Sequence, residues 1–516
     1  MRVKLNTEEK VGIKTGGNRN REAHMKAKIG LYSCGNKPYW DQFGGLKERL
    51  IGYGKFIGEK ISAEFGAEVY NFGLVDSPES GRNAGEYFNA NHVDLIFCHI
   101  ATYVPSAYVL PLHTSCRAKT VILNLQPSVK VNYAKTDTGE WLAHCNACAA
   151  PELCNAFRRS EIPYELISGL LGLQKTPEIS VTDENTANRP EAIRAWKEIG
   201  EWVRAAYAVH AMRHSKFGFL GNYYNGMLDM YSDFTLLQNK TGIGIEILEM
   251  CDLKRNFDKV TEEDVKKKRE EIERSFNIAG DSLSDKRVKK PTEDQLNWSA
   301  RVASAQEKMV KEYALDALAY YYHGSEGTQY QDIQSGFIVG HSLLTAKHVP
   351  CAGEADIKTC IAMKICDLLS LGGSFCEIVT ADYDLGTIIV GHDGPFHVAI
   401  AAEKPVLRGM GVYHGKQGTG ISVEAKVRTG DVTTLGLAQG AGGTLKMIIA
   451  EGESLDQEIM QIGNTQTHVR FSSLPDPFME RWFREAPTHH FALSIGKNAS
   501  LFVKIAKLFG IDAIVL

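Results

Sequence analysis

The chain has 516 residues, of which 44% are hydrophobic and 23% charged, a composition typical of a globular protein with roughly two to four domains. Its 58 basic and 62 acidic residues give a formal net charge of −4, which provides no electrostatic reason to bind nucleic acid or an anionic membrane. The sequence contains neither an apolar run of membrane-spanning length nor the apolar core of a signal peptide near its start. We therefore expect a cytoplasmic protein with no nucleic-acid or membrane partner, whose eleven cysteines are reduced.

The first part of the chain alternates strand-like and helix-like patterns after a polar arm at residues 1–25. Apolar runs rich in β-branched residues predict strands, and amphipathic stretches between them predict helices: strands at 28–33, 68–75, 93–99, 120–125 and 164–169, and helices at 44–65 and 151–159. Strands that alternate with helices usually form a parallel sheet. We predict a Rossmann-like, doubly wound α/β domain over residues 1–180.

The alternation resumes after a polar linker that ends at Pro190. The patterns predict helices at 190–214 and 355–369, strands at 216–220 and 244–250, and a charged helical region at 254–315. In the lysine-rich run 266–274, acids are interleaved with bases, which indicates a solvated helix face more than a nucleic-acid patch. We predict a second Rossmann-like, doubly wound α/β domain over residues 181–371.

The character of the chain changes after Gly372, where glycines become frequent and β-branched residues cluster. Four segments have the composition and spacing of antiparallel strands: 386–391, 419–424, 432–437 and 444–452. A short α/β tail at 500–511 follows. The expected fold class is therefore α/β, with two doubly wound domains followed by a β-rich, barrel-like C-terminal domain over residues 372–516.

Three cysteines lie close together in the first domain. Cys145 and Cys148 form a CxxC sequence, and Cys154 follows six residues later in a predicted helix. No second CxxC follows them, so we interpret these cysteines as structural or neutral, with a zinc or redox site as the open alternative.

Four residues toward the C-terminal end carry most of the functional information: Glu354, Glu377, His392 and His490. Each lies at the edge of an apolar segment. Two carboxylates and two imidazoles without a thiolate suit Mn²⁺, Mg²⁺ or Co²⁺ in an octahedral site. Considered singly, Glu354 could instead interact favourably with the positive end of the dipole of a helix that starts there. A lone histidine is more often a polar residue with ordinary hydrogen-bond partners than a metal ligand. Their joint occurrence favours a metal site.

The motifs around these residues resemble a known group of enzymes. Gly353-Glu354-Ala-Asp356-Ile-Lys358-Thr359, Ser374-Phe-Cys-Glu377, Gly391-His392 and Thr488-His489-His490-Phe are similar to the metal-site motifs of the L-arabinose isomerase and L-fucose isomerase superfamily. The two histidines are closer to the arabinose isomerase branch. The resemblance implies that Glu354, Glu377, His392 and His490 hold Mn²⁺, with Mg²⁺ or Co²⁺ as alternatives.

The implied activity is aldose–ketose isomerisation of a pentose or deoxyhexose, with conversion of L-arabinose to L-ribulose as the first choice. Glu354 and Glu377 would transfer protons through a cis-enediol. Which of them is the base stays open, as does a hydride shift. L-Fucose, D-galactose or a modified hexose are alternative substrates. A non-catalytic sugar-binding regulatory protein is the main rival, and a two-carboxylate glycoside hydrolase is a weaker one.

The resemblance also implies the surroundings of the site. Trp40 and Gln42, in the first strand-to-helix loop, and His489 are expected to bind the sugar, although Trp40 could simply pack. Asp356 and Lys358 could orient Glu354 or form an ordinary helix-surface ion pair. A histidine that arabinose isomerases supply from the first domain has no clean equivalent, because His99 is out of register. The expected assembly is a homotrimer or homohexamer with active sites near subunit interfaces.

Overall fold

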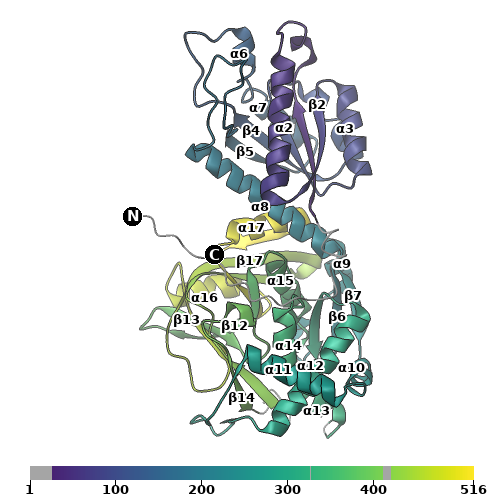
Figure 1. Ribbon diagram of the computed structural model, residues 1–516, viewed down its shortest axis with the longest axis vertical. Coiled ribbons are helices and arrows are strands. Elements are labelled where there is room, and N and C mark those ends of the chain that lie inside the picture. The colour runs from purple at the N-terminus through teal and green to yellow at the C-terminus, as the bar shows by residue number, and fades with distance from the viewer. Residues whose placement is uncertain (1–25, 323, 326, 411–419) are drawn as a thin grey trace. The chain divides into compact units, whose positions relative to one another are not determined.

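The computed structural model describes residues 26–322, 324–325, 327–410 and 420–516. The chain forms two compact units, Met1–Ala192 and Ile193–Leu516 (Figure 1). The polar arm expected at residues 1–25 lies outside the described residues. The predicted boundaries at 180/181 and 371/372 stay predictions.

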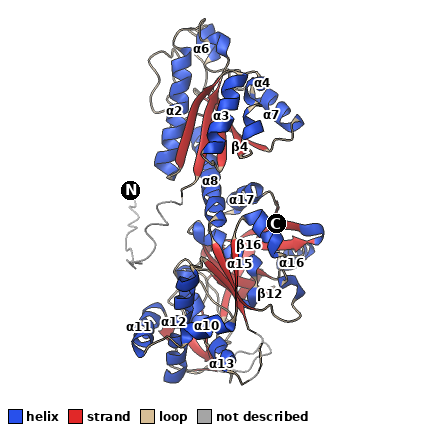
Figure 2. Ribbon diagram, turned by 90° about the vertical axis from the view of Figure 1, so that its right-hand side faces the viewer, coloured by secondary structure: helices blue, strands red, loops and turns tan. Residues whose placement is uncertain are grey.

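The first unit is built on a five-stranded parallel sheet in the order β2-β1-β3-β4-β5. Helix α2 covers one face of this sheet, and α3 and α7 cover the other (Figure 2). This is a doubly wound α/β arrangement, as predicted. The elements are β1 Lys28–Cys34, α2 Leu46–Phe65, β2 Glu68–Val75, α3 Pro78–Ala90, β3 Leu95–Ile100, α4 Ser106–Val109, α5 Leu112–Ser115, β4 Lys119–Gln126, α6 Thr138–Leu142, α7 Ala150–Arg159 and β5 Tyr164–Leu170.

The second unit contains another parallel sheet, in the order β11-β10-β6-β7. Strand β10, Ala317–Tyr321, was not predicted from the sequence and lies at the centre of this sheet. The other elements of this part are α8 Pro190–Arg213, β6 Lys216–Gly221, α9 Phe234–Thr241, β7 Gly244–Leu248, α10 Met250–Phe257, α11 Glu262–Ser275, α12 Glu293–Tyr313, α13 Gln329–Ser335, α14 Phe337–Ala346, β11 Cys351–Ala352 and α15 Ile357–Leu368.

Helix α11 has the solvated face expected for the run 266–274, formed by the exposed side chains of Lys266, Lys267, Glu270, Glu273 and Arg274. Lys268 departs from this expectation, because it is 7% exposed and forms ion pairs with Glu271 and Glu307. A buried ammonium group needs such partners, because removing it from water without an ion-pair partner costs roughly several kcal/mol. The interleaved acids and bases of this segment therefore include a buried ion-pair cluster.

Six antiparallel strands of the second unit close into a barrel, in the order β16-β19-β12-β13-β18-β17, because β16 also pairs with β17. This confirms the predicted barrel-like architecture. The elements are β12 Gly372–Asp382, β13 Thr387–His392, β16 Gly430–Gly440, β17 Thr444–Leu455, β18 Thr465–Phe471, α16 Pro475–Arg484, β19 His490–Ile495, α17 Ala499–Phe509 and β20 Asp512–Val515. A small separate sheet joins β8 Asn277–Ile278, β9 Val288–Lys289, β14 Val406–Met410 and β15 Gly420–Glu424.

The described helices include none that combines the length and the apolar character needed to cross a membrane.

Candidate metal centre

Pairing of barrel strands brings three of the predicted ligands together. Glu377 of β12 lies directly opposite His490 of β19 on one side and Gly391 of β13 on the other. His392, the next residue, ends β13. Because paired strands lie about 4.8 Å apart, this register places the side chains of Glu377 and His490 side by side on one face of the sheet. His392 follows the residue opposite Glu377 and joins them at the end of its strand. One ligand atom from each of Glu377, His392 and His490 lies within 4.8 Å of the other two.

Glu354 reaches the same neighbourhood from outside the barrel. It lies in a short turn after β11, and its backbone φ of 56° is in the left-handed region, which is unusual for a residue with a side chain. Its carboxylate oxygens are 3.9 Å from His392 Nε2 and 3.7 Å from His490 Nε2. Glu354 and His490 form a second potential metal-binding group with His489. All four predicted ligands therefore belong to one cluster that shares His490.

The alternative role of Glu354 as a helix-start carboxylate is wrong. Helix α15 begins after Glu354, and Asp356 is its N-cap, accepting the Thr359 amide at 3.0 Å and the Thr359 hydroxyl at 2.7 Å. Such a side-chain oxygen satisfies an otherwise unpaired amide of the first turn. The helix start therefore has its own carboxylate, and Glu354 is left for another role.

Two histidine nitrogens face each other at the centre of the cluster. Nε2 of His392 and Nε2 of His490 are 3.2 Å apart. Two cis ligands of an octahedral ion, each about 2.1–2.3 Å from it, are separated by about 3.0–3.3 Å. The buried ring of Phe375 packs against both imidazoles, with centroid distances of 4.7 and 4.3 Å, and so restrains them. The pair is spaced as two ligands of one cation would be.

The opposite nitrogens of these rings have partners of their own. His490 Nδ1 is 3.2 Å from Asp356 Oδ2, so a proton on Nδ1 is donated to the carboxylate and Nε2 keeps its lone pair. His392 Nδ1 accepts the Gly394 amide at 2.8 Å and also lies 3.1 Å from Asp393 Oδ1. A Cβ at position 394 would be only 2.8 Å from His392 Nδ1, which explains the glycine.

These two neighbours allow either tautomer of His392. With Nδ1 accepting from Gly394, the ring proton lies on Nε2 and can be donated to His490. With Nδ1–H donated to Asp393, Nε2 is free to bind a cation. Metal binding at Nε2 would therefore require the proton to leave that nitrogen.

Charge in the cluster also suits a cation. Burial acts to raise the pKa of Glu354, but interactions with His489, His490 and His392 outweigh it and lower the pKa. The ionised carboxylate is 8% exposed, and its Oε2 has no hydrogen-bond partner among the described residues. Burial lowers the pKa of His490 despite the nearby Asp356, which favours the neutral ring. An ionised carboxylate beside the neutral imidazole of His490 is the protonation state that metal binding needs.

His489 is held differently from its neighbour. Its Nδ1 is 2.6 Å from Asp229 Oδ2, and its Nε2 is 3.7 Å from Glu354 Oε2. Burial opposes the charged form, but Asp229 and Glu354 raise the pKa of His489 to about 10. The ring is therefore cationic at neutral pH, and a protonated imidazole donates hydrogen bonds and does not ligate metal.

Lys358 supports the loop that carries Asp229. It is buried, and its Nζ donates to the carbonyl oxygens of Asp229 and Met230 at 2.8 and 3.1 Å and to Ser232 Oγ at 2.8 Å. This excludes the helix-surface ion pair that was one reading of Lys358. The loop had no signal in the sequence, because its residues become relevant only through contacts with segments more than 120 positions away.

A pocket opens beside Glu354 and His392. Its walls come from β10, α13, α14, the turn around Glu354 and strands β14 and β15, and two of its aromatic rings, Tyr224 and Tyr321, stack with centroids 4.7 Å apart. The lining residues are Tyr224, Tyr320, Tyr321, Gln334, Ser335, Phe337, Ile338, Gly353, Glu354, His392, Asp393, Gly394, Met410, Ile421 and Ser422. Glu354 and His392 therefore border this pocket, whereas Glu377, His489 and His490 are not among its lining residues.

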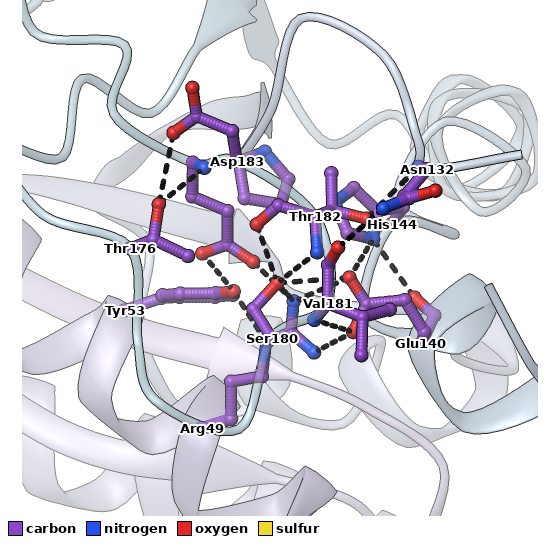
Figure 3. A network of polar contacts seen from close by, with 12 residues as sticks. Arg49, Tyr53, Asn132, Glu140, His144, Thr176, Ser180, Val181, Thr182 and Asp183 are labelled. Carbon is purple, nitrogen blue, oxygen red and sulfur yellow. Dashed lines mark hydrogen bonds and ion pairs between the residues drawn. The ribbon is translucent and has the colours of Figure 1, made fainter. Parts of the chain in front are cut away.

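A second cluster with metal-ligand composition lies in the first unit: Glu140, His144 and Glu184. The guanidinium of Arg49 lies beside Glu140 in Figure 3, and it also pairs with Glu184. Arg49 Nη1 donates to Glu140 at 2.6 Å, Nη2 pairs with Glu184, and Tyr53 donates to Glu184 at 2.6 Å. This cluster already has its cation.

Two predicted sugar-binding residues also lie in the first unit. Trp40 Nε1 donates to Asp76 Oδ2 at 2.8 Å, and Gln42 Nε2 donates to the Pro38 carbonyl at 2.6 Å. Both lie between β1 and α2, as expected, and their role in sugar binding stays a prediction. His99 is buried inside β3 and its Nδ1 is 2.9 Å from Ser33 Oγ; burial lowers its pKa to about 3.

The fold and the His/Glu cluster define an α/β-plus-barrel protein with a candidate divalent-metal site. No protein-family model matches the chain. L-Arabinose isomerase from Aeromonas salmonicida (strain A449) is 22% identical over 337 residues, which cover 62% of this chain and 64% of that protein, so the chain matches less than two thirds of its relative's length. This supports a distant relationship to that superfamily at most.

Among solved structures, a candidate acylhydrolase from Bacteroides fragilis aligns with 37% of this chain and 93% of its own at 8% identity. Its TM-score of 0.21 is too low to support any conclusion about fold or function.

Proposed function

We propose that this protein is a metal-dependent aldose–ketose isomerase in which Glu354, Glu377, His392 and His490 hold the cation. The observation that carries the proposal is the buried carboxylate of Glu354, whose Oε2 accepts no hydrogen bond among the described residues, beside two Nε2 atoms 3.2 Å apart. A buried carboxylate oxygen that accepts no hydrogen bond is costly, and a divalent cation shared with the two imidazoles would satisfy it. The donor set of oxygens and nitrogens favours Mn²⁺, with Mg²⁺ or Co²⁺ as alternatives.

The chemistry would be divided between the cation and the two carboxylates. A bound cation would polarise the sugar carbonyl and orient two adjacent oxygens. One of Glu354 and Glu377 would remove the proton from the carbon next to the carbonyl, giving a cis-enediol. The other would protonate the neighbouring carbon or relay the hydroxyl proton, so that one proton leaves C2, one arrives at C1 and the hydroxyl hydrogen moves between the oxygens.

The substrate we propose first is L-arabinose, with L-fucose, D-galactose or a modified hexose as alternatives. The pocket beside Glu354 offers aromatic faces and polar groups, a combination that suits a sugar. His489, as a cationic donor 3.7 Å from Glu354, is proposed to contact a sugar oxygen. The proposed assembly is a homotrimer or homohexamer in which Trp40 and Gln42 contribute to sugar binding.

The experiment measures ketose formation from a panel of aldoses with Mn²⁺, after EDTA treatment, and after Mn²⁺ is restored. We expect turnover that EDTA abolishes and Mn²⁺ recovers. Glu354→Gln should lose both turnover and bound metal, whereas Glu485→Gln, which removes only a partner of Lys446 elsewhere on the second unit, should keep both. Absence of turnover on every sugar by protein that also retains no metal would refute the proposal.

A further inference from the structure

The turn between α6 and α7 places two thiols in direct contact. Sγ of Cys145 and Sγ of Cys148 are 3.0 Å apart, and Cys148 is exposed while Cys145 is half-buried. A disulfide bond needs the sulfurs to approach to about 2.05 Å, so a movement of about 1 Å would close it. We propose that Cys145 and Cys148 form a reversible thiol–disulfide pair, a site separate from the proposed isomerase centre.

The turn that carries the pair is fixed to the sheet of the first unit. Asn146, between the two cysteines, is buried and donates to Asn124 Oδ1 at 2.6 Å. Thr102 Oγ1 donates to the Leu142 carbonyl at 2.7 Å, just before the turn. Because the turn is anchored just before Cys145 and again between the two cysteines, the thiols are held near each other before any oxidation, which favours ring closure over reaction with separate molecules.

The zinc site that the sequence left open lacks ligands here. The potential metal-binding groups found among the described residues are Glu354/His489/His490, Glu377/His392/His490 and Glu140/His144/Glu184, and none includes a cysteine. A structural zinc ion needs four ligands, commonly with several cysteines. Two thiols in contact, with no third or fourth ligand among the described residues, fit a dithiol better than a metal site.

The two cysteines have different environments and therefore different roles. Exposed Cys148 is the thiol that an incoming disulfide can reach. Burial, together with the neighbouring Cys148, raises the pKa of Cys145 to about 12, so Cys145 is a poor first nucleophile in the resting protein. It is nevertheless in position to react once Cys148 has been modified.

The reaction balances with a small-molecule disulfide, such as oxidised glutathione, as oxidant. The Cys148 thiolate attacks one glutathione sulfur, forms a mixed disulfide and releases one glutathione thiolate. Cys145, losing its proton to solvent, then attacks Sγ of Cys148 and releases the second glutathione. The protein dithiol is oxidised by two electrons, and one glutathione disulfide is reduced to two thiols.

The test equilibrates the full-length protein in a series of buffers of reduced and oxidised glutathione, blocks free thiols with N-ethylmaleimide, and maps peptides by mass spectrometry. We expect the peptide that contains residues 145–148 to lose two hydrogens, at about tenfold less oxidised glutathione than is needed to modify the exposed Cys251. Cys154→Ser, in the following helix, should leave this oxidation unchanged.

Variants of the pair separate the two steps. Cys145→Ser should accumulate glutathione on Cys148, and Cys148→Ser should leave Cys145 unmodified. The proposal is overturned if the wild type keeps glutathione on Cys148 with Cys145 free, or if Cys251 is modified while the pair stays reduced. Zinc that co-purifies with the wild type and is lost in both variants would also overturn it. None of these readouts depends on isomerase activity.

Discussion

The two units each bury a cluster of two carboxylates and at least one histidine, and the clusters differ in how the negative charge is compensated. In the first unit, Arg49 lies between Glu140 and Glu184 and donates to both. In the second unit, Glu354 Oε2 has no hydrogen-bond partner among the described residues, and its nearest charged or titratable neighbours are histidines. The residue types are alike, but the carboxylates of the first cluster share a guanidinium, whereas the cation beside Glu354 is the ring of His489, whose Nε2 is 3.7 Å from Oε2.

This difference separates a structural ion-pair network from a candidate metal centre. An arginine between two carboxylates satisfies them in the folded protein and leaves no place for an ion. Carboxylate and imidazole acceptors that face one another without such a group leave a position that a divalent cation fits. Composition alone could not distinguish these clusters; the position of Arg49 does.

The largest expected effect comes from removing the carboxylate of Glu354. Glu354→Gln should lower kcat/KM for the best aldose by at least about 10⁴-fold, since it removes both a ligand and a candidate proton carrier. Metal analysis after gel filtration should show loss of Mn²⁺, with Glu485→Gln as the control. Full metal occupancy and unchanged turnover in Glu354→Gln would contradict the distinction between the two clusters.

The next effect concerns stability in the first unit. Arg49→Met should destabilise the protein by about 3–5 kcal/mol, because it leaves two buried carboxylates without their cation. Denaturant unfolding measures the loss. The double variant Arg49→Met/Glu184→Gln should recover part of it, because one buried charge is removed as well. Equal stability of the single variant and wild type would show that Arg49 does not compensate these acids.

A pH experiment tests the same ion pair. Burial opposes ionisation of Glu140, but Arg49 and the other hydrogen-bond donors to the Glu140 carboxylate lower the pKa of Glu140 to about 2. A lowered folded-state pKa contributes stability above the unfolded value near 4.5, and this is lost as pH falls toward 2. The contribution is on the order of 2 kcal/mol. Unfolding at pH 7 and pH 3 should differ less in Glu140→Gln than in wild type; an equal difference would contradict the assignment.

The smallest effect concerns the pocket of the second unit. Gln334 borders this pocket, and its Oε1 is buried without a hydrogen-bond partner among the described residues. We expect Oε1 to accept a sugar hydroxyl, a contact worth about 0.5–1.5 kcal/mol. Gln334→Leu should therefore lower kcat/KM for the best aldose by up to about tenfold. It should also reduce the ratio of kcat/KM for that aldose to kcat/KM for an epimer of it. A uniform change for all sugars would instead indicate general packing.

Strands with strong apolar patterns were predictable, and those defined by tertiary contacts were not. The predicted strand at 68–75 coincides with β2, and the change of pattern after Gly372 foretold the barrel. Strand β10 was missed because five residues after a long charged helix give little periodic signal. The register that places Glu377 opposite His490 depends on pairing between distant segments, which no local pattern encodes.

The candidate site also contains features that the sequence predicted and features that it did not. Short motifs identified the four residues that the structure brings together, but they did not identify what holds them. Asp229, which binds His489, and Phe375, which packs on both imidazoles, act through contacts formed only in the fold. The expected role of Glu354 at a helix start failed because Asp356, two residues later, caps α15.

The closed barrel has a consequence for how the protein folds. Glu377 and His490 become neighbours only when β19 pairs with β12, two strands separated by most of the barrel sequence. Closing so long a loop is entropically unfavourable and slow compared with local contacts. A chain with a mispaired barrel would therefore lack the complete ligand set. Metal binding would then indicate that a molecule has folded correctly. The fraction of molecules that bind metal would equal the fraction whose barrel has closed in the right register.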